Sequence, residues 1–183
     1  MRAMVLSAQR PIAERPLIAR RLPVPDPGRG EVLLAVTACA ICRTDLHIAE
    51  GDLPLLRSPL VLGHQIVGRV LRSGQDAGRL QPGTRVGVAW LRRTCGACAY
   101  CTSGRENLCA KAEFTGYHAD GGYAEYAVVP AAFAVKIPDT AQPPKIWLSV
   151  LPIFPPISLP VPKGRSARKF PLNWCLRSNV EGP

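Results

Sequence analysis

The sequence predicts a mainly β domain, a small barrel, over residues 1–139 and an irregular tail over residues 140–183. Three observations support this division. Short segments rich in β-branched and apolar residues recur through the first part, and glycine and proline pairs separate them. After Asp139 the composition and the residue pattern change. Residues 141–183 hold nine prolines and two glycines and show no helical or strand periodicity. We therefore expect no regular secondary structure in the tail.

The expected elements of the first part follow one another closely. Each candidate strand has the β-branched and apolar residues typical of a strand, and the breaks between them carry turn signals such as Pro27-Gly28, Pro82-Gly83 and Gly121-Gly122. One short segment has a helical pattern instead. We expect strands at residues 31–38, 60–62, 65–71, 84–90 and 123–129, and a helical turn at residues 44–51. Many short strands with frequent turns favour a barrel over alternating βαβ units.

Composition and charge limit the function classes. The chain has 183 residues, an apolar content of 47% and a net charge of +10, which raises the possibility of nucleic-acid binding. Residues 141–183 carry six Lys or Arg and one acid, so half of the excess, +5, lies in the tail and the body is only mildly basic. Solvated surface charge is the simpler interpretation. The long apolar run at 146–162 contains five prolines and makes a poor membrane span, so we expect no membrane partner.

Four thiols fall within fifteen residues, in the spacing C-x2-C-x2-C-x7-C. No secretory signal is visible at the N-terminus, which favours a cytoplasmic protein with reduced cysteines and argues against disulfides. A redox pair needs only two of the four, and a nucleic-acid knuckle would include His and more basic or aromatic residues. Four thiolates at short spacing can enclose one zinc ion with no open position, which makes a structural site. We expect this site at Cys95, Cys98, Cys101 and Cys109.

With the segments around it, this spacing resembles the N-terminal catalytic domain of the zinc-dependent medium-chain alcohol dehydrogenases, over about residues 1–139. In that family the four-cysteine lobe holds the structural zinc. The resemblance implies a GroES-like β-barrel, a Rossmann domain after it, and interconversion of a small alcohol with an aldehyde or ketone by NAD(P). The mildly basic body and the few basic or aromatic residues of the lobe argue against a nucleic-acid partner, and the oligomeric state is not readable from the sequence.

The resemblance also implies a second, catalytic zinc site. The segment Cys42-Arg-Thr-Asp matches the motif of the first zinc ligand, here Cys42, and Gly63-His64 matches that of the second, here His64. Asp45 matches the acid that orients the zinc-bound histidine, and Thr44 the hydroxyl that meets the alcohol oxygen. His47 is expected near the proton relay and Trp90 in the substrate pocket. Cys39 is expected to be a small buried residue, not a ligand.

The chain departs from the family pattern at three places. Gln65 stands where the family has a glutamate beside the zinc histidine. The family's third catalytic ligand should follow the barrel, but residues 148–156 hold no Cys, His, Asp or Glu, and Cys175 has an unrelated setting. Finally, no G-x-G-x-x-G follows a strand, and the 44 residues after Asp139 are too few for a Rossmann fold.

These observations leave two functional hypotheses. The first is the zinc-binding catalytic domain of an NAD(P)-dependent alcohol dehydrogenase, in a chain that we expect to be truncated. The second is a zinc-stabilised GroES-like barrel with a structural or binding role and no turnover. The third zinc ligand and the dinucleotide domain would distinguish them, and the sequence shows neither.

Overall fold

The computed structural model describes residues 1–78 and 80–140, and strands dominate this part of the chain. The predicted mainly β class is therefore confirmed. The expectations for the tail, for residues 148–156 and for Cys175 concern positions outside the described residues.

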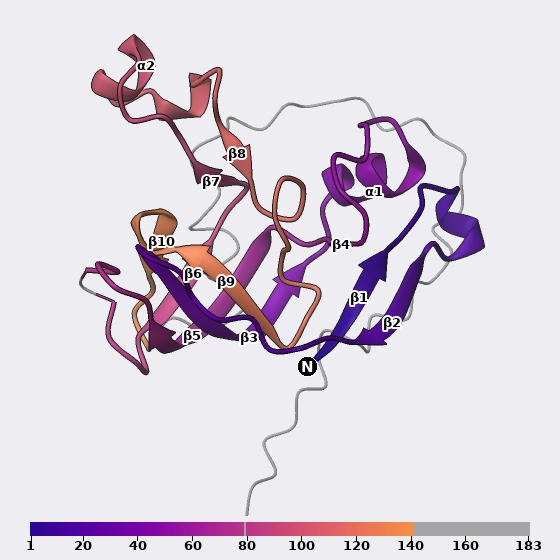
Figure 1. Ribbon diagram of the computed structural model, residues 1–183, viewed down its shortest axis with the longest axis horizontal. Coiled ribbons are helices and arrows are strands. Elements are labelled where there is room, and N and C mark those ends of the chain that lie inside the picture. The colour runs from indigo at the N-terminus through magenta and orange to yellow at the C-terminus, as the bar shows by residue number, and fades with distance from the viewer. Residues whose placement is uncertain (79, 141–183) are drawn as a thin grey trace, which may run out of the picture. The chain divides into compact units, whose positions relative to one another are not determined.

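The strands form three antiparallel sheets (Figure 1). One has the order β2-β1-β4 and consists of β1 (Arg2–Leu6), β2 (Leu17–Arg21) and β4 (Leu60–Val61). The central sheet has the order β10-β6-β5-β3-β9 and consists of β3 (Glu31–Ala40), β5 (Gln65–Ser73), β6 (Arg85–Val88), β9 (Tyr126–Pro130) and β10 (Ala134–Lys136). The third pairs β7 (Leu91–Arg93) with β8 (Glu113–Phe114).

Short helices complete the fold. The α-helices within residues 1–78 and 80–140 are α1 (Arg43–Glu50) and α2 (Ala99–Thr102). Single 3-10 turns are η1 (Ile12–Glu14), η2 (Glu106–Leu108) and η3 (Ala131–Phe133). No helix among the described residues is long and apolar enough to cross a membrane.

Most of the predicted elements are present with shifted ends. The strand predicted at residues 84–90 is shorter in the structure, since β6 ends at Val88 and Ala89-Trp90 connect it to β7. The strand predicted at 123–129 is β9, displaced to 126–130 because Tyr123 lies in a bend. Five of the described strands had no prediction, and one of them, β7, is a three-residue strand that begins directly after the predicted segment 84–90. Most of β2 is exposed and lacks an apolar alternation, β1 is a single short run, and β8 and β10 are only two and three residues long.

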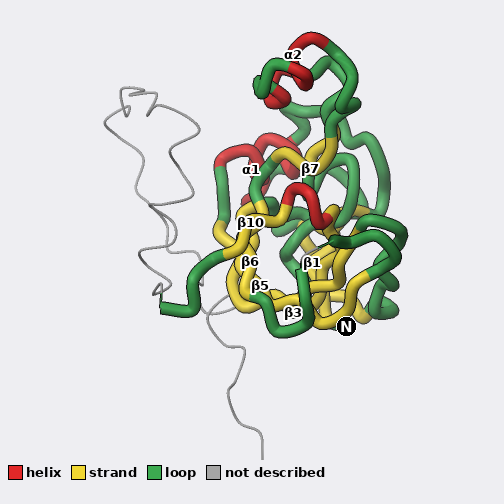
Figure 2. Tube along the Cα trace, turned by 90° about the vertical axis from the view of Figure 1, so that its left-hand side faces the viewer, coloured by secondary structure: helices red, strands yellow, loops and turns green. Residues whose placement is uncertain are grey.

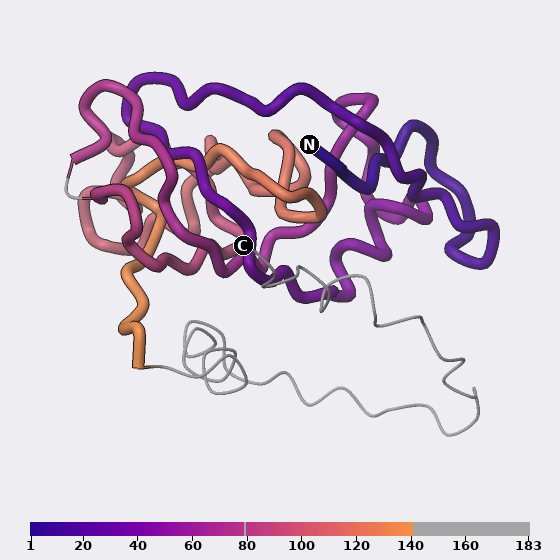
Figure 3. The backbone as a smooth tube through the Cα atoms, turned by 90° about the horizontal axis from the view of Figure 1, so that it is seen from below, coloured from indigo at the N-terminus to yellow at the C-terminus, as the bar shows by residue number. Residues whose placement is uncertain are grey.

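The core lies where the two larger sheets meet. Strand β3 pairs with β5 on one side and β9 on the other, and Val32, Leu33 and Leu34 are buried along it. In the described part of the chain, the largest side chains that are almost fully buried are Leu6, Val32, Leu33, Leu34, Ile48, Leu60, Val61, Leu62, Ile66, Val70, Val86 and Val129. Each contributes about 1.5–3 kcal/mol on leaving water. Figure 3 shows the connection between β2 and β3, residues 22–30, running along one side of the molecule.

Helix α1 follows β3 directly, and its position determines that of the predicted catalytic residues. Cys42 is its N-cap in extended conformation, and the Asp45 carboxylate receives the Cys42 backbone N–H. The helix buries Ile48 and Ala49 in the core. It ends at Gly51, whose φ of 100° is the left-handed conformation that glycine adopts at helix C-termini.

The β7–β8 pair carries a lobe, residues 94–112, away from the central sheet. Figures 1 and 2 both place α2, within this lobe, at the far end of the molecule from Met1. Arg92 on β7 is buried; it donates to Val128 O at 2.8 Å and to the Glu31 carboxylate at 2.9 Å. The pKa of Arg92 is lowered chiefly by burial, and Glu31 opposes that shift. The base of the lobe is thereby joined to β3 and β9.

Candidate metal centres

The lobe brings the four predicted thiols together. All four sulfur atoms of Cys95, Cys98, Cys101 and Cys109 lie within 4.8 Å of one another. The separations are 3.5 Å for Cys98–Cys101, 3.6 Å for Cys95–Cys109 and 3.8 Å for Cys95–Cys101. A tetrahedron with Zn–S bonds of about 2.3 Å has sulfur atoms ~3.8 Å apart. The cluster therefore has the dimensions of a four-thiolate zinc site.

Short local elements hold these sulfurs in place. Cys98 caps α2, Cys101 lies within α2, and Cys109 follows η2, so two tight turns replace a hydrophobic core. The Cys95 thiol has its pKa lowered to about 6 by the backbone N–H groups of Ala97 and Cys98 and by the neighbouring thiols. Thiolates are the metal-binding form of cysteine, so this backbone geometry favours a cation.

The second predicted centre is organised by Asp45, which is buried at 3% exposure. Its Oδ2 accepts from the Cys42 backbone N–H at 2.8 Å and from the Tyr123 hydroxyl at 3.0 Å. Its Oδ1 accepts from the Gly63 backbone N–H at 3.1 Å and lies 3.4 Å from His64 Nδ1. The segments that carry Cys42 and His64 therefore meet at one carboxylate.

The imidazole of His64 is oriented by this carboxylate. His64 is 4% exposed, and its Nδ1 is a buried polar atom without a partner in good hydrogen-bond geometry. Because Nδ1 faces Asp45, an Nδ1–H there leaves the Nε2 lone pair available to a metal. Cys42 supplies a thiol from the start of α1. The donor set, one thiolate and one imidazole beside a buried carboxylate, suits zinc.

Gly63 fixes the loop that presents His64. Its φ is +93°, and a Cβ there would lie 2.6 Å from the Tyr123 ring and 2.8 Å from Cys39 Sγ. Three backbone hydrogen bonds run from residues 121–123 to this loop: Gly121 N–H to Val61 O, Gly122 N–H to Gly63 O, and Tyr123 N–H to Leu62 O. Only glycine fits here without displacing its neighbours.

The remaining predicted residues lie around this centre. The Cys42 thiol is 3.8 Å from Thr44 Oγ1. His47, one turn along α1, has its Nδ1 2.6 Å from Asp52 Oδ2. The Trp90 and His64 rings pack edge to face with their centroids 4.8 Å apart, and the Trp90 ring stacks on Phe114 with centroids 4.7 Å apart and planes 10° apart. Cys39 is buried within the core cluster, as expected.

Sequence reasoning missed four residues of this region. Tyr123 and Asp52 contact predicted site residues, and Phe114 and Tyr117 stack beside Trp90. No local pattern marks them, because their partners lie in other segments or, for Asp52, beyond the helix end. Within residues 1–78 and 80–140, the lobe cysteines are the one group of three or more potential metal ligands, so no third partner for Cys42 and His64 is found there.

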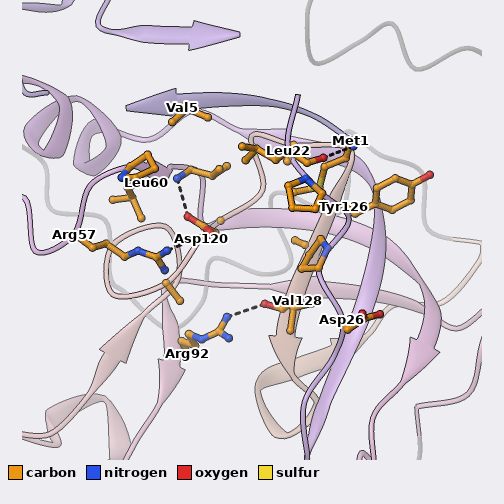
Figure 4. A pocket seen from close by; sticks show the side chains of 18 residues that line it. Met1, Val5, Leu22, Asp26, Arg57, Leu60, Arg92, Asp120, Tyr126 and Val128 are labelled. Carbon is orange, nitrogen blue, oxygen red and sulfur yellow. Dashed lines mark hydrogen bonds and ion pairs between the residues drawn. The ribbon is translucent and has the colours of Figure 1, made fainter. Parts of the chain in front are cut away.

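A cavity of about 440 Å³ lies elsewhere, between β1, the 22–26 connection, residues 119–121 and β9 (Figure 4). Three charged side chains of its lining are engaged with other groups: Asp120 receives the Val61 N–H and pairs with Arg57, while Arg92 donates to Val128 O. None of the predicted site residues lines this cavity. It is separate from both candidate metal centres.

Comparison with known proteins agrees with this geometry. The family model described as "Alcohol dehydrogenase GroES-like domain" matches residues 28–139. The chain is 52% identical over 120 residues to "Probable alcohol dehydrogenase AdhA" of Mycobacterium tuberculosis, covering 63% of this chain and 35% of that protein. It is 45% identical over 127 residues to an alcohol dehydrogenase of Geobacillus stearothermophilus, covering 69% of this chain and 38% of the relative. The chain thus spans about a third of the length of these relatives.

Solved structures of dehydrogenases also resemble this chain. A cobalt- and zinc-bound thermostable alcohol dehydrogenase from Pyrobaculum aerophilum superposes with a TM-score of 0.71 at 31% identity, covering 78% of this chain and 42% of the other. A structure described as a "putative zinc-binding dehydrogenase" from Sinorhizobium meliloti 1021, bound to NADP, gives a TM-score of 0.69 at 36% identity and covers 78% of this chain and 40% of the other. With the family match extending over more than half of its length, the chain belongs to the zinc-dependent alcohol dehydrogenase family through its GroES-like domain.

Proposed function

We propose that this chain forms the alcohol-binding domain of an NAD(P)-dependent oxidoreductase that interconverts an alcohol with an aldehyde or ketone. The observation that carries the proposal is the joining of Cys42 and His64 through Asp45. A buried carboxylate that accepts from the Cys42 backbone and faces the His64 imidazole is the arrangement that orients metal ligands.

The two centres have different roles in this proposal. The lobe cysteines Cys95, Cys98, Cys101 and Cys109 hold a zinc ion that stabilises a segment with almost no core of its own. Cys42 and His64 contribute two ligands to a second zinc. When bound there, zinc would act as a Lewis acid toward the alcohol oxygen and make its hydroxyl a stronger acid.

Proton removal is assigned to residues on α1. The Thr44 hydroxyl, beside the Cys42 sulfur, is placed to exchange a hydrogen bond with the alcohol oxygen. His47 lies further along the same helix and forms a charge-assisted contact with Asp52, so its Nδ1–H is held and its Nε2 can accept a proton. These roles make Asp52 a positioning residue for His47.

Substrate contact is assigned to the aromatic group Trp90, Phe114 and Tyr117. These rings stack on one another beside His64 and give an apolar surface next to the proposed metal. Such a surface favours the hydrocarbon part of an alcohol over a highly polar substrate.

The nicotinamide cofactor is proposed from the relatives, one of which was solved with NADP. Hydride transfer needs the nicotinamide close to the substrate carbon. Orientation of this kind can lower the activation barrier of a reaction by about 7–11 kcal/mol. The described strands all pair antiparallel, so this part of the chain supplies no parallel dinucleotide-binding sheet. We propose the cytoplasm as the compartment, since four clustered thiols, with Cys95 exposed, stay reduced there.

The alternative is a GroES-like barrel whose zinc has only a structural role. The absence of a third potential ligand near Cys42 and His64 among the described residues favours it.

The test uses the 183-residue chain loaded with two equivalents of Co²⁺, whose visible spectrum reports its ligands. If Cys42 and His64 form an open site, trifluoroethanol should change the spectrum of the second equivalent in the wild-type chain and have no effect in Cys42→Ser. A spectrum insensitive to the alcohol in both chains would support the structural alternative. Alcohol-dependent reduction of NAD or NADP is then measured on the same samples.

A further inference from the structure

We propose that Tyr123 is a positioning residue of the Cys42–His64 centre and acts through Asp45. This inference rests on the proposed zinc site and concerns a residue that has no role in the preceding proposal. Tyr123 is 5% exposed and lies 78 residues after Asp45 in the chain. Its hydroxyl donates to Asp45 Oδ2 at 3.0 Å.

The two oxygens of Asp45 face different groups. Oδ2 receives the Cys42 N–H and the Tyr123 hydroxyl, whereas Oδ1 receives the Gly63 N–H and faces His64 Nδ1. The two donors on Oδ2 determine the rotation of the carboxylate, and this rotation directs Oδ1 at His64. Loss of the Tyr123 hydroxyl leaves Oδ2 with one donor, on the neighbouring backbone, and the carboxylate gains freedom to turn.

The ring of Tyr123 restrains the His64 loop as well. It lies against Gly63 so closely that a Cβ there would be 2.6 Å from ring carbon Cδ1. Its backbone N–H donates to Leu62 O at 3.0 Å. Tyr123 therefore contacts the loop through its ring and backbone, and the Asp45 carboxylate through its hydroxyl. Removing only the hydroxyl separates these two contributions.

A buried carboxylate depends on its donors, because each hydrogen bond replaces one that water would make. Outer partners of a metal-bound histidine change metal affinity by about 10–100-fold when they are removed. The Tyr123 hydroxyl is one step further from the metal than Asp45. We therefore expect Tyr123→Phe to weaken the second zinc site by about tenfold, at the lower end of that range.

The experiment measures zinc binding by competition with a chromophoric chelator, in the full 183-residue chain. The tight equivalent belongs to the lobe and serves as an internal control. The weaker equivalent is assigned to the second site by its loss in Cys42→Ser. Tyr126→Phe is the matched control, since no hydrogen bond of the Tyr126 hydroxyl is found among the described residues and Tyr126 lines the cavity, to which no predicted site residue contributes. Tyr123→Phe should weaken binding of the second zinc equivalent and leave binding of the tight equivalent unchanged. Tyr126→Phe should change the binding of neither equivalent.

A double-mutant cycle distinguishes positioning from general loosening. In an Asp45→Asn background the Tyr123→Phe effect should fall below about twofold, because the hydroxyl has lost the carboxylate through which it acts. A tenfold effect that persists in that background, or no effect of Tyr123→Phe on a Cys42-dependent second equivalent, would refute the role of Tyr123 and leave the zinc site standing. Absence of any Cys42-dependent equivalent would overturn the proposed zinc site and this inference together.

Discussion

Arg92 and Glu31 form a mostly buried ion pair, with Nη2 and Oε1 2.9 Å apart and side chains 8% and 17% exposed. Arg92 belongs to β7, which leads into the cysteine lobe, and Glu31 begins β3 of the central sheet. Arg93 approaches the same carboxylate at 3.6 Å. One glutamate thus joins two arginines at the base of the lobe to the barrel.

Replacing Glu31 by Gln is expected to lower the free energy of unfolding by about 1.5–3 kcal/mol, because the buried Arg92 keeps its charge but loses the carboxylate that pairs with it directly. Urea denaturation of the zinc-loaded chain gives the difference. Asp76→Asn is the control, since it removes an exposed ion pair of 2.6 Å with Arg29 and should cost less than about 1 kcal/mol. Equal losses in the two variants would contradict the role of the buried pair.

The double variant Cys98→Ser/Cys101→Ser is expected to lose about one tightly bound zinc per chain, since two of four ligands are removed. Metal analysis after dialysis measures this. Cys39→Ala should keep the zinc, because Cys39 lies in the core and its sulfur packs near Gly63 and Gly122. Unchanged tight zinc in the double variant would rule out the lobe as the site.

Gly63→Ala is expected to be more destabilising than Gly30→Ala. Both glycines have positive φ, +93° and +73°, so either alanine adopts a left-handed conformation at about 1–2 kcal/mol. Only at Gly63 would the new Cβ also collide, with Tyr123 and Cys39, whereas nothing lies within 4 Å at Gly30. Overpacking should add about 1–3 kcal/mol to the loss at Gly63. Chemical denaturation measures the loss in free energy of unfolding for each variant. Equal losses would show that the Gly63 loop accommodates the new Cβ without destabilising the protein.

Glu125 should make a small pH-dependent contribution to stability. Its pKa is lowered by the Arg2 backbone N–H, then by the Arg2 side chain. A depressed folded-state pKa means that the stabilisation is present above the unfolded value, about 4.3, and is lost as pH falls through the lower folded value. Glu125→Gln should therefore melt slightly below wild type at pH 7 and match it under acid conditions. Thermal unfolding across this range measures the effect, and a difference independent of pH would contradict it. The exposed position of this pair keeps the effect small.

The sequence by itself determined the cysteine lobe, because its four ligands lie within fifteen residues and short turns alone can bring them together. It also determined most strands of the central sheet, whose apolar runs and turn signals are local. The helical turn predicted at residues 44–51 lies within one residue of helix Arg43–Glu50 at each end. Local chemistry was sufficient wherever a segment contacts mainly its own neighbours in the chain.

Only the tertiary structure decided how the second centre is held. Nothing near Asp45 in the chain indicates that Gly63 and Tyr123, 18 and 78 residues away, donate to its carboxylate. The ring stacking of Trp90 on Phe114 likewise depends on β7 pairing with β8. The exposed strand β2 has no apolar alternation to reveal it, and it forms because β1 provides a paired edge. Contacts between distant segments depend on which strands pair and in what register, and a single sequence shows the pattern of each strand without showing its partner.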